Sequence, residues 1–216
     1  MKYDINSQLN LNLGNAEISP NLQLKTITIP DGELIFSPNY FTQEESNIFY
    51  ENLLTEVNWR QDKIKLYGKE MDIPRLTAWY GDDGKCYTYS RITMSPNPWI
   101  PGLISIKNKV EKVVDVCFNS VLINLYRHGQ DSMAWHSDDE PELGRNPVIA
   151  SVTFGGARKF KLRHKFNKGL DKVELVLNHG SLLIMQGTTQ EYWQHQIPKT
   201  AKVISPRINL TFRVIQ

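Results

Sequence analysis

Two residues in the stretch WHSDDEPELG have the types and spacing of metal ligands. His136 and Asp138 are separated by one residue, so in an extended backbone their side chains point to the same side and can reach one ion. His195 is the candidate third ligand, because the other histidines fall in predicted turns or in a basic run. Two histidines and one carboxylate form the facial triad of non-haem Fe(II) oxygenases. Taken alone, however, the spacing favours three unrelated polar residues over a metal site.

The C-terminal stretch PRINLTFR adds polar residues that could hold a charged ligand. If it is a strand, four side chains share one face: Arg207, Asn209, Thr211 and Arg213. Four polar residues on an inward face would be unfavourable without a charged partner. A dicarboxylate such as 2-oxoglutarate would satisfy them, held by Arg207 at one end and chelating iron at the other. Asn124 and Tyr126 also share a face and could add hydrogen bonds. The alternative puts the arginines on the outer surface.

These side chains need a scaffold, and the sequence after residue 120 predicts one made of strands. Short β-type runs are separated there by Gly, Pro and Asn. The predicted strands are 121–126, 148–154, 159–163, 173–177, 181–185, 190–196 and 208–215. Closely spaced strands without helices between them predict a sandwich, barrel or jelly roll. The expected fold class is therefore mainly β with flanking α.

The first half of the chain predicts helices. Thr42 and Glu45 form a capping box before a helix at 43–57. A second helix begins at Pro101, which suits the first helical turn, and its apolar face continues to Cys117. Residues 1–30 are polar and are expected to form a loosely ordered leader, in which only 22–30 has the alternation of a strand.

Composition limits the class of protein. The 216 residues, 40% hydrophobic and 22% charged, fit one globular domain. No stretch has the length and apolar character of a signal peptide or a membrane span, so we expect no membrane association and a cytosolic location. The two isolated cysteines do not suggest a disulfide framework.

The positive charge is concentrated rather than large. The net charge is only +2, but the segment 158–172 carries seven Lys and Arg residues against one acid. Such an excess suits phosphate contacts. For a basic run considered alone, a solvated hairpin is the preferred interpretation.

A set of ordered motifs resembles a known family. NLYRHGQD, WHSDDE, PVIASVTFGGARKFKLRHK, GSLLIMQG, WQHQIP and PRINLTFR occur in this order, preceded by IPRLTAWYGDDGKCYTYSRITMSPNPWIP. The set is similar to the AlkB family of Fe(II)- and 2-oxoglutarate-dependent dioxygenases, and most of all to the homologues that repair duplex DNA. The resemblance covers most of the chain beyond residue 60.

The resemblance implies a fold and a cofactor site. The fold would be a double-stranded β-helix, a cupin-like jelly roll at 120–216, in a single domain 1–216 with a nucleotide-recognition lid at 60–100. Fe(II) would be held by His136, Asp138 and His195, which are also the expected catalytic residues. Arg207 would bind the distal carboxylate of 2-oxoglutarate. The rest of that pocket would comprise Asn124, Tyr126, Asn209, Thr211 and Arg213. O2 would be the oxidant.

The resemblance also implies alkylated DNA as the partner, with oxidative demethylation of 1-methyladenine and 3-methylcytosine and release of formaldehyde, succinate and CO2. A methylated base must leave the stack to be reached. Tyr89 and His136 would sandwich it, with Tyr87 nearby and Glu140 accepting a hydrogen bond from the exocyclic amine. The hairpin 64–75 would insert Leu66 and Tyr67 into the duplex; an ordinary hairpin tip is nearly as good an interpretation. Arg163 and Lys165, with the rest of the basic run, Lys199 and Lys202, would contact phosphates.

Two other hypotheses stay open. The first is an enzyme with the same cofactors that acts on methylated RNA or on a protein side chain. The second is a jelly-roll binding module without catalysis, against which the presence of all three ligands and both arginines argues. We expect a monomer, located in the cytoplasm if the chain is bacterial and in the nucleus if it is eukaryotic.

Overall fold

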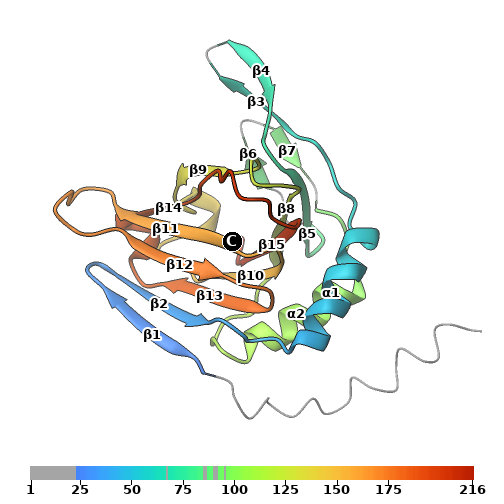
Figure 1. Cartoon of the computed structure of the whole chain (residues 1–216), viewed down its shortest axis with the longest axis horizontal. Coiled ribbons are helices and arrows are strands. Elements are labelled where there is room, and N and C mark those ends of the chain that lie inside the picture. Colours follow the sequence, from blue (N-terminus) through green and yellow to red (C-terminus); the bar gives the residue numbers. More distant parts are fainter. Residues whose placement is uncertain (1–22, 67, 85–86, 90–91, 95) are drawn as a thin grey trace, which may run out of the picture.

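Two antiparallel sheets form the body of the protein (Figure 1). The computed structural model describes residues 23–66, 68–84, 87–89, 92–94 and 96–216. The larger sheet has seven strands in the order β1 (Lys25–Ile29), β2 (Gly32–Ser37), β13 (Ser181–Gln186), β10 (Ile149–Gly155), β15 (Arg207–Arg213), β8 (Ser120–Tyr126) and β5 (Leu76–Gly81). The smaller sheet has the order β12 (Val173–Leu177), β11 (Arg158–His164), β14 (Trp193–Ile197) and β9 (Met133–His136). The predicted mainly β jelly-roll fold with flanking helices is confirmed.

Two helices cover the outer face of the larger sheet (Figure 1). Helix α1 (Gln43–Glu56) begins with the predicted capping box, in which the Thr42 side chain accepts from the Glu45 N–H and the Glu45 carboxylate accepts from the Thr42 N–H. Helix α2 (Pro101–Glu111) has its proline in the first turn, as predicted. A 3₁₀ turn (Pro141–Leu143) and a short helix α3 (Thr189–Tyr192) complete the helical segments in the described ranges. None of the described helices has the length and apolar character needed to cross a membrane.

The larger sheet separates an apolar core from a partly polar interior. On β15, the even-numbered residues Ile208, Leu210 and Phe212 pack into the cluster that includes α1 and α2. The odd-numbered residues point the other way, toward the smaller sheet, where a second apolar cluster includes Phe160, Leu162 and Trp193. Because the side chains of a strand alternate, the polar residues of β15 lie between the two sheets.

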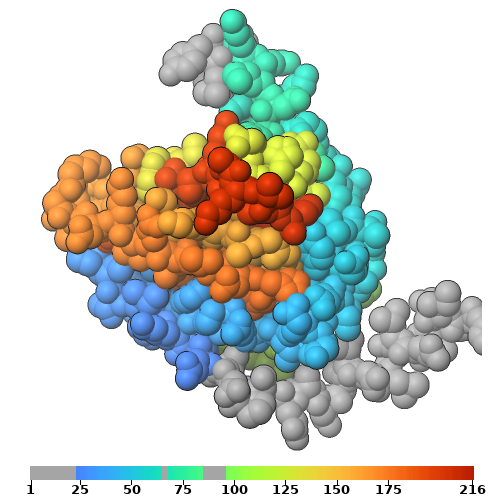
Figure 2. All heavy atoms as spheres, in the orientation of Figure 1, coloured from blue at the N-terminus to red at the C-terminus, as the bar shows by residue number. Residues whose placement is uncertain are grey.

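Two hairpins stand apart from the main sheets. The hairpin of β3 (Lys63–Leu66) and β4 (Lys69–Asp72) projects from the body (Figures 1 and 2). Residues 68–72 are all exposed, and Gly68 has a φ of 79° at the turn, a conformation that glycine adopts without strain. The second hairpin pairs β6 (Tyr87–Tyr89) with β7 (Ile92–Met94).

The N-terminal half contributes more to the sheet than the sequence predicted. The strand-like alternation at 22–30 is confirmed by β1, which pairs with β2 through a tight turn at Asp31, where φ is 54°. The expectation of a loosely ordered leader is therefore wrong for Lys25–Ile29. Residues 1–22 lie outside the described residues. The large sheet also takes β2 and β5 from before residue 120, and neither of these two strands was predicted from the sequence.

Two predicted elements differ by more than two residues at one end. The second helix ends at Glu111 rather than continuing to Cys117, because the chain turns back there and the Glu111 carboxylate accepts the N–H of Phe118 at 2.6 Å. The predicted strand 190–196 begins only at Trp193. Before it, the Thr189 hydroxyl donates to the carbonyl of Gln186 at 2.5 Å and starts the helical turn α3.

Candidate metal centre

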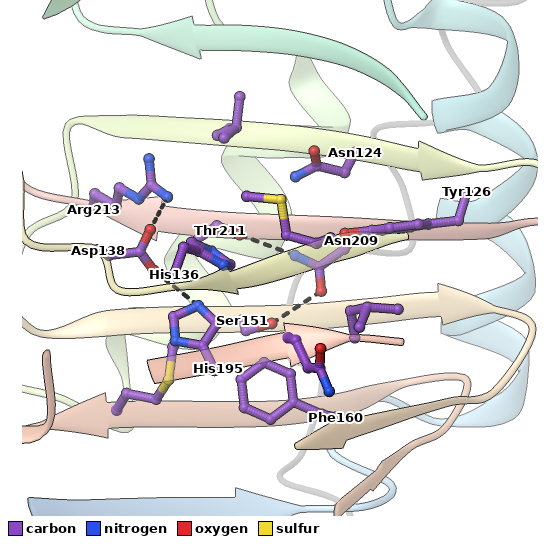
Figure 3. Close-up of a pocket in the computed structure, with 15 residues that line it drawn as sticks. Asn124, Tyr126, His136, Asp138, Ser151, Phe160, His195, Asn209, Thr211 and Arg213 are labelled. Carbon is purple, nitrogen blue, oxygen red and sulfur yellow. Dashed lines mark hydrogen bonds and ion pairs between the residues drawn. The ribbon is translucent and has the colours of Figure 1, made fainter. Parts of the chain in front are cut away.

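Three side chains converge at one end of the smaller sheet. His136 closes β9, His195 lies opposite it on β14 as its register partner, and their ring centroids are 4.1 Å apart. With Asp138, they offer ligand atoms that all lie within 4.8 Å of one another (Figure 3). In the described ranges this is the one group of three His, Cys, Asp or Glu residues that could share a metal ion. The chemistry of these donors is that of a facial triad.

Asp138 reaches the site by a different route from the one expected. The strand β9 ends at His136, so alternation along an extended strand does not orient both residues. Hydrogen bonds hold the turn instead: the Ser137 hydroxyl donates to the Trp193 carbonyl at 2.8 Å, and the Asp138 N–H donates to the Gln190 Oε1 atom at 2.9 Å. Gln190 is buried and was not singled out from the sequence.

The charges at the site suit a divalent cation. Burial opposes ionisation of Asp138, but the adjacent Arg213 and the two histidines outweigh it and lower the pKa of this carboxyl. Arg213 forms an ion pair with one Asp138 oxygen, and His195 Nε2 lies 3.6 Å from the other. Burial, together with His136, lowers the pKa of His195 to about 3. Asp138 is therefore anionic and His195 is neutral near pH 7, which are the forms that bind metals.

Each histidine is oriented by a neighbour. The His136 Nδ1 atom lies 2.9 Å from the Ala134 carbonyl oxygen, and because a carbonyl only accepts, Nδ1 carries the proton and Nε2 is free to bind a metal. The ring of Phe160 stacks on His195 with centroids 5.2 Å apart and planes 26° apart. Phe160 was not predicted, since its position in an alternating strand looks like any core residue.

A cavity lies beside these three residues, between the two sheets. Its empty volume, the open mouth included, is about 480 Å³. Sequence-predicted residues line it: Asn124, Tyr126, His136, Asp138, His195, Asn209, Thr211 and Arg213. The lining residues that the sequence analysis missed are Leu122, Met133, Ser151, Phe160, Met185, Gln196 and Ile197. Most of these are apolar, and in a sequence they are indistinguishable from core.

Arg207 lies behind this lining, fully buried. Its Nη2 atom donates to Thr153 Oγ1 at 2.9 Å and to Asn209 Oδ1 at 2.6 Å. Its Nε and Nη1 atoms have no hydrogen-bond partner within the described part of the chain. Burial lowers the pKa of Arg207 to about 10, and the guanidinium packs over the Tyr126 ring at 5.1 Å. A buried cation with unsatisfied donors fits an anionic ligand. The alternative that placed the arginines on the outer surface is wrong.

Arg213, Thr211 and Asn209 extend this polar row to the metal centre. Asn209 Oδ1 accepts from Ser151 at 3.0 Å, and its Nδ2 atom donates to Thr211 at 2.9 Å. The row places a cation at each end, with Arg213 at the Asp138 end (Figure 3). Such a row matches an elongated ligand with two acidic ends.

The candidate phosphate-binding residues lie outside the cavity. Arg163 donates to Gln194 Oε1 at 2.8 Å from Nη2 and stacks on Trp135 at 4.3 Å. The Lys165 ammonium donates to Asp139 at 2.9 Å and to the Gln190 carbonyl at 2.8 Å.

One member of the basic run is unsuited to phosphate contact. Arg158 is buried and donates to the carbonyls of Asp131 and Pro198 at 2.9 and 2.7 Å. The expectation that the whole run 158–172 faces nucleic acid is therefore wrong at this residue, because Arg158 shares the inward face of β11 with Phe160.

The remaining candidate substrate residues are described only in part. Glu140 is partly buried, precedes the 3₁₀ turn and does not line the cavity. Tyr87 and Tyr89 belong to β6 and Leu66 ends β3, but their side chains lie outside the described structure, as does Tyr67 entirely.

Comparisons with known proteins agree with this geometry. The model of the 2OG-Fe(II) oxygenase superfamily matches residues 33–213. Alpha-ketoglutarate-dependent dioxygenase alkB homolog 3 of Bos taurus is 47% identical over 186 residues, covering 82% of this chain and 64% of the relative. DNA oxidative demethylase ALKBH2 of Homo sapiens is 42% identical over 184 residues, covering 81% of this chain and 70% of the relative.

The chain thus spans about two thirds of the length of these relatives. A solved structure, that of OsALKBH1, superposes with a TM-score of 0.62 at 15% identity, covering 89% of this chain and all of that one. At this identity the likeness supports the fold alone.

Proposed function

Because the chain belongs to the 2OG-Fe(II) oxygenase superfamily and, within it, to the AlkB family, we propose that it is an Fe(II)- and 2-oxoglutarate-dependent dioxygenase that demethylates alkylated bases in DNA. The substrates proposed are 1-methyladenine and 3-methylcytosine. The observation that carries the proposal is the His-Asp-His cluster beside a cavity whose polar row leads to the buried Arg207.

The residues present fit the cofactors of the family. His136, Asp138 and His195 would hold Fe(II), and their donor set leaves positions open for a bidentate ligand and O2. Bound Fe(II), with 2-oxoglutarate and O2, supplies the oxidation of the N-methyl group, so that the methyl carbon leaves as formaldehyde and 2-oxoglutarate becomes succinate and CO2. The protein contributes binding, orientation and electrostatics.

The polar row would orient 2-oxoglutarate. Arg207 would pair with the distal carboxylate through its Nε and Nη1 atoms, whose lack of partners in the described structure supports this role. Asn124, Tyr126 and Thr211 would add hydrogen bonds from the cavity wall. Asn209 is already bonded to Arg207, Ser151 and Thr211, so its role would be to align its neighbours. Arg213 would keep Asp138 ionised and in place.

The substrate contacts are proposals of the same kind. Tyr89 and His136 would sandwich the extruded base, with Tyr87 beside it and Glu140 near the exocyclic amine. The β3–β4 hairpin would insert Leu66 and Tyr67 between base pairs, and its projection from the body supports this use (Figure 2). Arg163 and Lys165 would contact phosphates, although Lys165 would first exchange its bond with Asp139.

The oligomeric state and the location of the enzyme are proposed from its site residues and from its substrate, respectively. One chain supplies all three proposed iron ligands and both arginines of the polar row, so we propose a monomer. It would act where DNA is, in the cytoplasm of a bacterial cell or the nucleus of a eukaryotic one. Methylated RNA or a protein side chain as substrate, and a purely binding function, have no observation that favours them here.

The first experiment uses one oligonucleotide carrying 1-methyladenine, offered as a single strand and as a duplex. The protein is supplied with Fe(II), ascorbate and 2-oxoglutarate, and the bases are identified by mass spectrometry. Conversion to adenine that requires 2-oxoglutarate and is lost in His136→Ala would establish the reaction. No conversion of either form by iron-loaded protein would refute the DNA substrate and direct the search to RNA and protein.

The hairpin is tested separately by replacing residues 66–68 with a polar loop. If the tip acts as a wedge, activity on the duplex falls while activity on the single strand, the internal control, is kept. Activity of the variant on the duplex that is unchanged from the wild type would exclude wedging.

A further inference from the structure

Arg75 is a buried arginine outside the residues assigned so far. It lies between the β3–β4 hairpin and β5, and it is 7% exposed. Its Nε atom donates to Asn124 Oδ1 at 2.7 Å, and its Nη1 atom donates to the Ser132 carbonyl at 3.3 Å. Asn124 lines the cavity. Arg75 therefore contacts a residue of the cavity wall without lining the cavity itself.

This contact determines which way the Asn124 amide faces. A guanidinium has donors and no acceptor, so the group that meets Arg75 must be the amide oxygen. The amide NH2 group then faces away from Arg75. In Figure 3 the amide nitrogen of Asn124 lies on the side of Thr211 and Asn209, and the amide oxygen lies on the opposite side. The cavity therefore receives a donor from Asn124, which is the polarity needed to bind a carboxylate or a keto oxygen.

The base of the hairpin holds Arg75 in turn. Gln61 Nε2 donates to the carbonyls of Ile73 and Arg75 at 2.8 and 3.2 Å, and Gln61 Oε1 accepts from Arg127 at 3.3 Å. Arg127 is fixed by Asp131 at 2.8 Å. The backbone that carries Arg75 is thus anchored on both sides of the hairpin, which limits the positions available to its side chain.

We propose that Arg75 is a positioning residue for 2-oxoglutarate, which acts by holding the Asn124 amide with its NH2 group toward the cavity. The inference rests on the proposed function, since 2-oxoglutarate is the ligand that the function requires. Without Arg75 the amide can rotate, and the cavity then meets an acceptor oxygen for part of the time. An acceptor facing a carboxylate weakens binding, because neither group supplies a proton.

Binding of 2-oxoglutarate is measured by titration calorimetry with Mn(II) in place of iron, so that no turnover occurs. The variants are Arg75→Met, Asn124→Ala and the double variant. Each single variant is expected to weaken binding about tenfold, as for one hydrogen bond to a charged group. The double variant is expected to bind no more weakly than Asn124→Ala, because Arg75 acts through Asn124. In turnover by the Arg75→Met variant, the KM for 2-oxoglutarate is expected to rise while kcat changes less than twofold.

Arg127→Met is the matched control. The Arg127 side chain bonds to Gln61 and Asp131 at the same junction, and neither of these two residues lines the cavity. Gln61 keeps its own bonds to the Ile73 and Arg75 carbonyls in this variant, so the affinity of the variant for 2-oxoglutarate is expected to stay within twofold of the wild type. If Arg75→Met does not fold, Arg75→Lys replaces it, because lysine keeps the charge but has no donor at the Nε position.

Three outcomes have separate meanings. Unchanged affinity in the Arg75 variant, with a wild type that binds 2-oxoglutarate, would overturn this inference and leave the proposed function standing. Effects that multiply in the double variant to about a hundredfold would also overturn it, because Arg75 would then act independently of Asn124. Failure of the wild type with Mn(II) to bind 2-oxoglutarate would overturn the proposed function itself.

Discussion

Replacing Arg207 with methionine separates the stability of this protein from its proposed binding function. Large, fully buried side chains are usually needed for stability, and truncating one costs about 2–5 kcal/mol. Arg207 is fully buried, yet its charge is poorly compensated in the absence of a ligand. We expect the ligand-free Arg207→Met variant to be within about 1 kcal/mol of the wild type in free energy of unfolding, and to lose its affinity for 2-oxoglutarate.

The magnitude follows from the contacts of the guanidinium. The fall in the pKa of Arg207 to about 10 corresponds to roughly 3 kcal/mol against the charged form. Methionine removes this penalty and fills much of the space. The losses are the bonds to Thr153 and Asn209, about 1 kcal/mol each, and the contact with Tyr126, about 0.5–1 kcal/mol. The gains and losses nearly cancel.

The affinity for 2-oxoglutarate, unlike the free energy of unfolding, should change strongly in Arg207→Met. A bidentate pair between a buried guanidinium and a carboxylate is among the strong hydrogen-bonded contacts, and we expect at least a hundredfold weaker binding without it. At 2-oxoglutarate equal to 100 times the wild-type Kd, the ligand should stabilise the wild type by about 2.7 kcal/mol and the variant by less than about 0.4 kcal/mol.

The assay is urea unfolding followed by tryptophan fluorescence, with Mn(II) and with or without 2-oxoglutarate. Arg158→Met is the matched contrast: Arg158 is also buried over the Tyr126 ring, but it satisfies the carbonyls of Asp131 and Pro198. That variant should lose about 2 kcal/mol or more by orphaning two carbonyls, while its folded fraction should still bind 2-oxoglutarate. An Arg207→Met variant that loses more than about 2 kcal/mol without ligand, or keeps wild-type affinity, would refute the reasoning.

Other perturbations test individual contacts. Asp138→Ala leaves Arg213 buried without its carboxylate and should destabilise the protein by about 3–5 kcal/mol, measured by urea unfolding of the metal-free form; an unchanged midpoint would exclude the ion pair as a stabilising contact. Burial opposes ionisation of Asp131, but hydrogen bonds from Arg127 outweigh it and lower its pKa below 3.8, so this stabilisation is complete above that pH and is lost below it. The difference in stability between wild type and Asp131→Asn should therefore be constant from pH 7 to about 5 and shrink below about 4, and a difference independent of pH would contradict the ion pair. Thr42→Ala should cost about 1 kcal/mol, lower the melting temperature by about 2–4 °C and leave turnover unchanged; an altered kcat would show that α1 influences the site.

The alternation of β15 was readable in the sequence because it depends only on the period of a strand. The expectation that Arg207 and Arg213 share an inward face is confirmed by their burial. The pairing of His136 with His195 depends on the register between β9 and β14, which no local pattern contains. The sequence made His195 a candidate third ligand only because the other histidines were less suitable, and the resemblance to a family then implied the full set.

Other parts of the site could not be read from the sequence for physical reasons. Phe160 stacks on His195, but an apolar residue in an alternating strand looks the same whether it packs in a core or against a ligand. Arg75 meets Asn124 across 49 positions of sequence, and the type of neither residue reveals the contact. The alternation at 22–30 indicated β1, but β2 was not predicted, although it lies between β1 and β13 in the larger sheet.

Because the two faces of β15 meet different neighbours, a change in the length of this strand should disrupt both faces, whereas a substitution affects only the face on which it lies. Substitutions on the helix-facing side and on the cavity side meet different neighbours, so each side can vary without the other. A one-residue insertion within the strand would exchange the faces, sending arginines under the helices and Ile208, Leu210 and Phe212 into the cavity. Length variation among natural or designed variants should therefore fall in the preceding loop at 198–206, where Val203 is fully exposed.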